Sequence, residues 1–201
     1  MKLKVLALDL STKSGWSSAY SDLDGYVLDS HGTIEKRSEP SYLKYPESYV
    51  EWVKLCFGDI KKVIDKQTPD VVIIEETTPG RNSFSQKILE WIHYLVVLEL
   101  LANKKPIYYL KTGVWRDAVN SRMNKDEAKK NISIRKIKTK TGVKLAKDDN
   151  GKVMGKITKK HVSIRRVEEL FGLKFKMKDN DTAEAILIGK AWHELRFKEA
   201  K

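Results

Sequence analysis

The sequence is poor in the features that mark secreted, metal-stapled or membrane proteins. It has one cysteine in 201 residues, which excludes a disulfide framework and a four-cysteine zinc site. That residue, Cys56, lies in an apolar string and is typical of a buried thiol in a reducing compartment. No apolar run reaches the roughly 20 residues that span a membrane, and the first residues show no signal-peptide pattern. We therefore expect a soluble, cytoplasmic protein with no membrane partner.

Length and composition predict one compact domain covering residues 1–201, since 41% of the residues are apolar and 33% are charged. The formal net charge is +12, and the segment from Ser121 to Lys178 holds 19 Lys and Arg against 6 Asp and Glu, a net charge of +13. Such a segment favours a polyanionic partner. A membrane surface fits poorly, because apolar anchors do not alternate with the charges at helical spacing. Nucleic acid is therefore the favoured partner.

The basic segment contains an insertion, at about residues 121–155, that is predicted to be a flexible loop or hairpin. Connections of this length inside a compact domain are usually functional or disordered. Two interpretations are open: a loop that is mobile without DNA and grips phosphates, or a loop that is merely solvated. In the first, the phosphate contacts come from Arg135, Lys136, Lys138 and Lys140.

The stretch from Leu3 to Trp16 combines a buried strand with a single acid. Its continuous apolar run predicts a strand covered on both faces. Near the end of that run lies Asp9, and burying an unpaired carboxylate costs several kcal/mol, roughly, so a partner or a metal is expected. The small polar loop of residues 11–15 lets a phosphate or a metal ion approach the backbone. The alternative is an Asp9 that only caps a turn.

Apolar spacing predicts the order of the other elements. Two strands of a meander follow the first, then a helix, a buried strand, a second helix, a short strand, a brief helix and two further helices. The second helix, from about Ser83 to Asn103, is apolar nearly all round, so it lies either in the centre of the core or half buried in a subunit interface. The predicted ranges are 16–20, 26–34 and 46–66, then 71–74, 83–103 and 107–110, then a short helix around residue 115 and two further helices, from 158 to 171 and after 180.

Three further acids lie where they could meet Asp9. Glu75 and Glu76 end the second buried strand, and only one of them can point toward Asp9, because strand side chains alternate. Asp181 and Glu184 are three residues apart and share one face of the last helix. A capping box is the alternative for that pair. Capping does not explain the whole set, whereas two Mg²⁺ ions about 3.5–4 Å apart need several carboxylates.

The order of elements resembles the ribonuclease-H-like fold, which implies a mixed five-stranded sheet, three strands antiparallel and two parallel, flanked by helices. Within that fold the chain resembles the RuvC-like Holliday junction resolvases, especially those of bacteriophages. Three motifs carry the resemblance: ALDLSTKSGW with Asp9, PDVVIIE with Glu75, and DTAEA with Asp181 and Glu184. Glu184 departs from the family, which has Asp there and a shorter reach. Where cellular members place an aromatic wedge, this chain has Thr77 followed by Thr-Pro-Gly, so base stacking at the crossover is not carried over.

The resemblance implies a Mg²⁺-dependent endonuclease, a homodimer that cuts branched DNA, in the host cytoplasm if the chain is phage-encoded. Asp9, Glu75, Asp181 and Glu184 would hold two Mg²⁺ ions, for which Mn²⁺ can substitute. Hydrolysis would leave a 5′-phosphate and a 3′-hydroxyl. Lys160 matches a family lysine that contacts phosphate near the site, and a Trp-Arg pair at 115–116 resembles one common in the phage branch. The predicted DNA-binding residues, on these grounds and from the basic face of the helix after residue 158, are Arg116, Lys159, Lys160 and Arg165 together with the four of the basic insertion.

Two other functions are compatible with the sequence. One is a nuclease of the same fold that acts on flaps or RNA–DNA hybrids. The other is an actin-like or Hsp70-like ATP-binding domain, since residues 8–15 also resemble the first phosphate loop of those ATPases. They need two such domains and a second phosphate loop, which 201 residues without a repeat do not supply.

Overall fold

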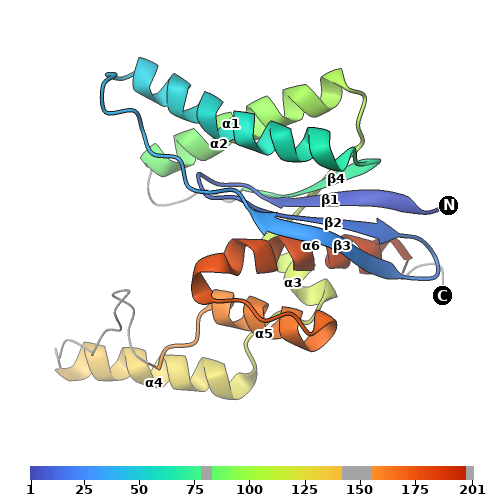
Figure 1. The fold of residues 1–201 in the computed structure, drawn as a ribbon. Helices are drawn as coiled ribbons and strands as arrows, with labels where there is room; N and C mark the ends of the chain where they lie inside the picture. Colours follow the sequence, from blue (N-terminus) through green and yellow to red (C-terminus); the bar gives the residue numbers. More distant parts are fainter. Residues whose placement is uncertain (78–82, 142–154, 198–201) are drawn as a thin grey trace.

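The computed structural model describes residues 1–77, 83–141 and 155–197, with only the backbone for 135–141. An N-terminal meander is followed by helices that alternate with two more strands, and helices fill the C-terminal part (Figure 1). The elements are β1 (Leu3–Asp9), β2 (Gly15–Ser21), β3 (Tyr26–Thr33), α1 (Glu47–Gln67), β4 (Val71–Glu75), α2 (Ser83–Ala102), β5 (Ile107–Leu110), α3 (Thr112–Ala118), α4 (Lys125–Thr141), α5 (Lys159–Phe171), the short 3₁₀ helix η1 (Met177–Asp179) and α6 (Asn180–Phe197).

One five-stranded sheet has the strand order β3-β2-β1-β4-β5. β1, β2 and β3 are antiparallel neighbours, whereas β4 runs parallel to β1 and β5 runs parallel to β4. Helices α1 and α2 cover one face of the sheet, and α6 with α3 covers the other, with α5 packed on α6 (Figure 1). This arrangement confirms the predicted mixed sheet flanked by helices.

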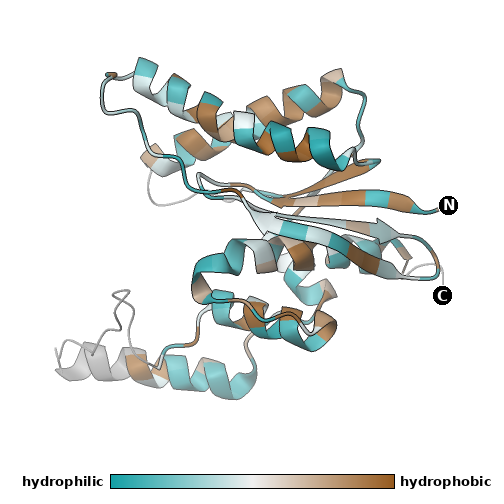
Figure 2. Cartoon of the chain, viewed as in Figure 1, coloured by the Kyte–Doolittle hydropathy of each residue, from teal (hydrophilic) through white to brown (hydrophobic). Residues whose placement is uncertain are grey.

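The alternation of side chains along β1 and β4 divides the interior into two cores. Leu6 and Leu8 face α1 and α2, whereas Val5 and Ala7 face α6, and residues 71–74 alternate in the same way on β4. Figure 2 shows the hydrophobic residues running through these two strands in the middle of the fold. Because the period of a strand is two residues, Asp9 continues the series that faces α6. The last residue of β4, Glu75, does the same.

The first turn of α6 lies against the sheet beside Asp9. Gly15 pairs with Asp9 across β1 and β2, and a Cβ on Gly15 would lie 2.0 Å from the carbonyl oxygen of Asp181. Only glycine allows this approach of the helix backbone. The contact is fixed by a hydrogen bond of 2.7 Å between the hydroxyl groups of Thr33 and Thr182. These two contacts therefore fix the position of the start of α6 relative to the end of β1.

Against the described part of the chain, helix α2 packs through one face. Ile88, Ile92 and other apolar residues of that face are buried in the core shared with α1, whereas Tyr94, Leu98 and Leu101 are 62%, 45% and 60% exposed. Of the two predicted placements, the one in the centre of the core is wrong, since these three apolar side chains face outward. Across residues 1–77, 83–141 and 155–197, no helix is long and apolar enough to cross a membrane.

The predicted basic loop is wrong over residues 125–141, which form helix α4. The reason is a capping box that the count of charges obscures: the Asn124 side chain accepts from the Glu127 backbone N–H, and the Glu127 carboxylate accepts from the Asn124 N–H, both at 2.9 Å. Lysine and arginine are also good helix formers. Asn131 anchors the helix through two hydrogen bonds to the backbone of Ile157. Residues 142–154 of the predicted loop lie outside the described residues.

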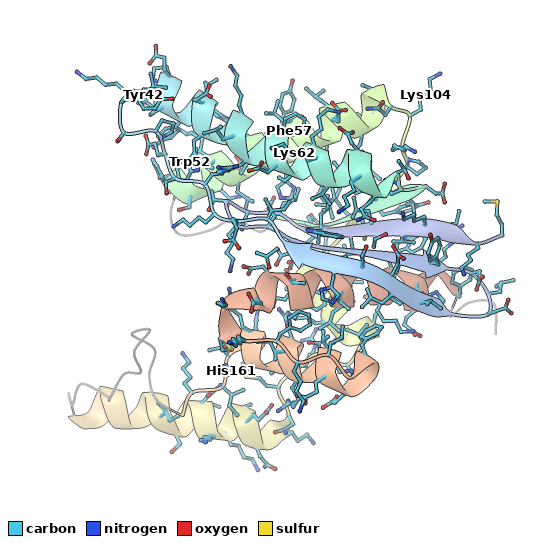
Figure 3. The ribbon with its side chains drawn as sticks, viewed as in Figure 1. Tyr42, Trp52, Phe57, Lys62, Lys104 and His161 are labelled. Atoms are coloured by element: carbon cyan, nitrogen blue, oxygen red, sulfur yellow. The ribbon has the colours of Figure 1, made fainter. Side chains whose placement is uncertain are left out.

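Helix α5 begins and ends with the expected signals. The Thr158 hydroxyl accepts a hydrogen bond from the backbone N–H of His161, which is labelled in Figure 3, and the His161 side chain accepts one in return. Gly172 ends the helix in the left-handed conformation, with φ of 68°. These caps fix the register of α5, whose first turn carries Lys160 toward the start of α6.

Candidate metal centre and active site

Three of the four predicted acids meet at one edge of the sheet. Asp9, Glu75 and Glu184 each offer a carboxylate oxygen, and these three atoms lie within 4.8 Å of one another. The parallel register that pairs Leu8 with Ile74 places Asp9 beside Glu75, and the first turns of α6 supply Glu184 from the face to which both point. The carboxyl ends of parallel strands are the usual place for a site in such a sheet.

Asp9 shows the electrostatic strain of this cluster. Its pKa is raised well above the usual value, first because burial disfavours the charged form and then because Glu184, Glu75 and Asp181 repel it. The ammonium group of Lys160 opposes the shift. The cluster therefore carries more negative charge than the neighbouring cations offset, and a divalent cation would stabilise it.

Asp181 and Lys160 lie at the edge of the cluster. Asp181 is close enough to raise the pKa of Asp9 but is not among the three acids with converging ligand atoms. One of its oxygens lies 3.4 Å from the Lys160 ammonium, which also donates to the Asn180 side-chain oxygen at 3.0 Å. The Lys160 side chain remains 46% exposed. The Lys160 side chain therefore extends from Asp181 to the protein surface.

Glu184 is held by two residues from other helices. Its Oε1 accepts a hydrogen bond from the Arg116 guanidinium at 2.5 Å and from the Ser163 hydroxyl at 3.0 Å. Arg116 and Glu184 are 6% and 8% exposed, so this is a buried ion pair. The carboxylate thus points into the fold and does not cap α6. Arg116, predicted to bind DNA, is placed to position this carboxylate and not at the surface.

Glu75 is held by residues that follow β5. Its Oε1 accepts hydrogen bonds from the Thr112 hydroxyl at 2.5 Å and from the Trp115 indole N–H at 3.1 Å. The sequence could have indicated the contact of Thr112 with Glu75, because Thr112 lies just after β5, which runs parallel to the strand of Glu75. Ser163 lies in the middle of an amphipathic helix, and its contact with Glu184 has no such signal. Glu76, the neighbour of Glu75, uses its backbone N–H to extend the pairing with Leu110.

A cavity of about 190 Å³ opens beside the cluster, with Asp9, Glu75 and Thr112 on one side and His93 of α2 on the other. Burial lowers the pKa of His93 to about 4, so its imidazole is neutral at pH 7. Its Nδ1 lies 3.3 Å from the Tyr109 hydroxyl. His93, which the sequence did not indicate, adds a polar wall without adding charge.

The predicted DNA-binding cations other than Arg116 lie in three places. Lys159 and Lys160 are exposed at the start of α5, and Lys160 lies beside Asp181. Arg165 instead pairs with the buried Glu127 at the start of α4 and lies 3.8 Å from Glu169, so it attaches α4 to α5. The four predicted residues of the insertion lie on the C-terminal half of α4, which extends beyond the rest of the fold (Figure 1). They are Arg135, Lys136, Lys138 and Lys140.

The cluster has the donors that a hard divalent cation requires. All three converging ligands are carboxylates, which suit Mg²⁺ and Mn²⁺ better than softer metals. Among the residues that the structure describes, the hydrogen bonds to Glu75 and Glu184 end on Oε1, which leaves Oε2 of each for a metal. The raised pKa of Asp9 shows that its ionised form is disfavoured in this cluster. A bound divalent cation would stabilise that form. The residues therefore fit a divalent metal.

Comparison with known proteins shows the fold. No family model and no curated protein matches the sequence. The structure of Thermus thermophilus RuvC with a Holliday junction substrate matches 96% of this chain and 96% of its own, with a TM-score of 0.63 and 13% identity. The yeast mitochondrial Holliday junction resolvase matches 97% of this chain and 80% of its own, with a TM-score of 0.53 and 13% identity. The fowlpox virus resolvase with Holliday junction DNA matches 96% of this chain and 99% of its own, with a TM-score of 0.50 and 13% identity.

Proposed function

We propose that this chain is a metal-dependent endonuclease that resolves four-way or other branched DNA junctions. The observation that carries the proposal is the convergence of Asp9, Glu75 and Glu184 at the carboxyl ends of two parallel strands, in the fold that the chain shares over nearly its whole length with junction resolvases. The basic surface beside these acids suits a DNA substrate. We place the reaction in the cytoplasm, where a buried free thiol such as Cys56 stays reduced.

Asp9, Glu75 and Glu184, with Asp181 at the edge, would hold two Mg²⁺ or Mn²⁺ ions. Bound there, the two ions would activate a water for in-line attack on the phosphodiester and stabilise the leaving 3′-oxygen, giving a 5′-phosphate and a 3′-hydroxyl. Thr112 and Trp115 keep the Glu75 carboxylate in one orientation, and Arg116 with Ser163 does the same for Glu184. Such fixed ligands need no rearrangement during the reaction.

Lys160 would bind the phosphate that is cut. Its ammonium group is half exposed and lies between Asp181 and the surface, where it offsets the repulsion between the acids and the incoming phosphate. Lys159, its exposed neighbour, extends the positive charge away from the site. A strand entering along the start of α5 would thus meet two cations before it meets the carboxylates.

A cleavage panel tests this function. A four-way junction, a fork, a flap, an RNA–DNA hybrid and a linear duplex of matched sequence are incubated with the protein in Mg²⁺, in Mn²⁺ and in a chelator. We expect paired nicks across the junction, ligatable ends, and no cutting in the chelator. Faster cutting of the flap or the hybrid than of the junction would transfer the assignment to another nuclease of this fold.

We further propose that the protein acts as a homodimer. Two symmetric cuts in a four-way junction need two sites related by a twofold axis. The exposed apolar face of α2, with Tyr94, Leu98 and Leu101, is the surface that fits the contact. It lies on the side of the sheet opposite α6, so pairing there would leave both sites open to DNA.

Changing Leu98 to glutamate should convert the dimer into soluble monomers, because a charge at the centre of an apolar contact is left desolvated. Trp91 is unsuitable for this test, since it packs against the core. The measurement is the mass in solution by light scattering, with cleavage of the junction in parallel. The control is Leu23→Glu, in the β2–β3 turn, where Leu23 is 72% exposed. A wild-type mass of one chain, with and without DNA, would contradict the dimer.

We also propose that the C-terminal half of α4 grips the phosphates of a junction arm. The helix is anchored at its first turn by Glu127 and Arg165 and then extends beyond the fold (Figure 1). In a helix, Lys136 and Lys140 share a face, as do Arg135 and Lys138. A rigid basic helix of this kind can lie along a duplex without ordering a loop first.

Replacing those four residues with alanine should weaken binding to junctions and to linear duplex alike, because phosphate contacts position a protein without reading sequence. For every phosphate that the variant no longer neutralises, the slope of log affinity against log salt concentration should become shallower by about 0.9. The control removes the same charge from the α1–α2 side of the molecule, at Lys54, Lys62, Lys66 and Lys104, two of which are labelled in Figure 3. An unchanged slope in the α4 variant, or a change no larger than that of the control, would show that α4 is merely solvated.

A further inference from the structure

A second cavity lies behind the carboxylate cluster, between α3, the turn after it and the start of α5. Its volume is about 320 Å³, within the range of pockets that hold small organic groups. Two of its lining residues also hold the acids: Thr112 donates to Glu75 and Arg116 donates to Glu184. The cavity is therefore separated from the candidate metal centre by single side chains.

Two residues that line the cavity carry buried polar atoms that the fold does not satisfy. Ser121 is 1% exposed and Arg116 is 6% exposed, and within the part of the chain that the structure describes neither Ser121 Oγ nor Arg116 Nε has a hydrogen-bond partner. The rest of the guanidinium is fixed by Ser163, by Glu184 and by the Trp115 ring 4.2 Å away. Buried polar atoms without hydrogen-bond partners are rare and costly, so a ligand that supplies such partners is expected.

The other lining residues describe the shape of that ligand. Val162 and Met123 give apolar walls, and two exposed cations, Arg122 and Lys159, line the same cavity. Apolar walls, buried hydrogen-bonding atoms and outer cations together suit a flat ring with polar edges that is attached to a phosphate. A nucleotide has this chemistry, and its base edges carry the acceptors that Arg116 Nε and Ser121 Oγ can bind.

We propose that this cavity holds one unstacked nucleotide of the bound DNA strand, a role that rests on the proposed junction-cleaving function. Its base lies between Val162 and Met123 and bonds to Arg116 Nε and Ser121 Oγ, while its phosphate faces Arg122 and Lys159. A branch point supplies an unstacked base at a lower cost than a duplex does. Because Arg116 and Thr112 contact both the cavity and the acids, the captured nucleotide fixes which phosphodiester reaches the site.

Filling the cavity tests the inference, and Gly113 of α3 is the position for it. Among the described residues, a Cβ there would have one neighbour within 4 Å, Arg122 Nη2 at 3.8 Å, so Gly113→Leu places its side chain at the cavity without a backbone clash. The control is Val114→Leu, one position along the same helix, where Val114 is 43% exposed and does not line the cavity. A milder second variant, Ser121→Ala, removes one bond and leaves the space open.

The measurement uses 2-aminopurine placed at each position around the branch point of a four-way junction, bound to these variants in an Asp9→Asn background. We expect a rise in fluorescence at one position, retained by Val114→Leu and abolished in Gly113→Leu together with a roughly tenfold loss of junction affinity. Ser121→Ala should reduce the preference among bases at that position. If wild-type protein cuts junctions but no position brightens, or Gly113→Leu brightens like the control, the inference is overturned and the function stands. If wild-type protein neither binds nor cuts junctions, both fall.

Discussion

Asp9→Asn should abolish cleavage of a four-way junction while the variant binds the junction as tightly as the wild-type protein. Asp9 lies at the centre of the converging carboxylates, and an amide in its place removes one negative charge and one metal ligand. Metal ions contribute several kcal/mol to such a transition state, and each 1.4 kcal/mol, roughly, is a factor of ten in rate. We therefore expect a loss of about 1,000-fold or more. The measurement is single-turnover cleavage in Mg²⁺, with binding followed by fluorescence anisotropy.

The same substitution should raise the thermal stability of the metal-free protein. Burial and three neighbouring acids raise the pKa of Asp9, so its ionised form is unfavourable in the folded state. The neutral amide removes that repulsion, and the melting temperature in a chelator should increase. Asp29→Asn, at an exposed position of β3, is the control for loss of one charge. Cleavage by Asp9→Asn at the wild-type rate would refute the assignment of the site, and a lower melting temperature would contradict the electrostatic account.

The place of Asp9 and Glu75 follows from local patterns in the sequence. Each ends an apolar strand, and the alternation that buries Val5 and Ala7 on the α6 side continues to Asp9. Two parallel strands that are adjacent in the sheet must bring their carboxyl ends together. Glu184 follows from the helical spacing of the last element. The burial of both strands and the position of the acids at their ends were thus accessible because a short-range period decides them, whereas the mixed sheet was expected only from the family resemblance.

The contacts that hold these acids were not accessible, because they join segments far apart in the chain. Arg116 and Glu184 are 68 residues apart, and a basic residue after a short strand is equally typical of a surface cation. Helix α4 was missed for another reason: the basic count and the length of the connection outweighed the capping box at Asn124. The exposed face of α2 could not be chosen either, since a helix that is apolar all round does not indicate which side is buried.

Arg116→Met should be the most destabilising single change in the candidate site. Arg116 and Glu184 form a buried ion pair, and removing one partner of such a pair costs about 3–5 kcal/mol, because the other charge is left uncompensated. Here the remaining carboxylate also lies within 4.8 Å of ligand oxygens of Asp9 and Glu75, so its repulsion increases. For a chain of this size the melting temperature should fall by roughly 6–20 °C. Mg²⁺ should recover part of the loss, since it would compensate the same charge.

Two further variants separate the charge from the packing. Arg122→Met removes an arginine of the same surface whose pair with Asp117 is 60% exposed on both sides, and it should change the melting temperature little, because exposed ion pairs contribute little. The double variant Arg116→Met, Glu184→Gln removes both charges and should recover much of the stability without recovering cleavage, since Glu184 is needed for the metal. If the double variant melts as low as Arg116→Met alone, the arginine stabilises the fold through its contacts with Trp115 and Ser163, and the ion pair with Glu184 is not the source of the effect.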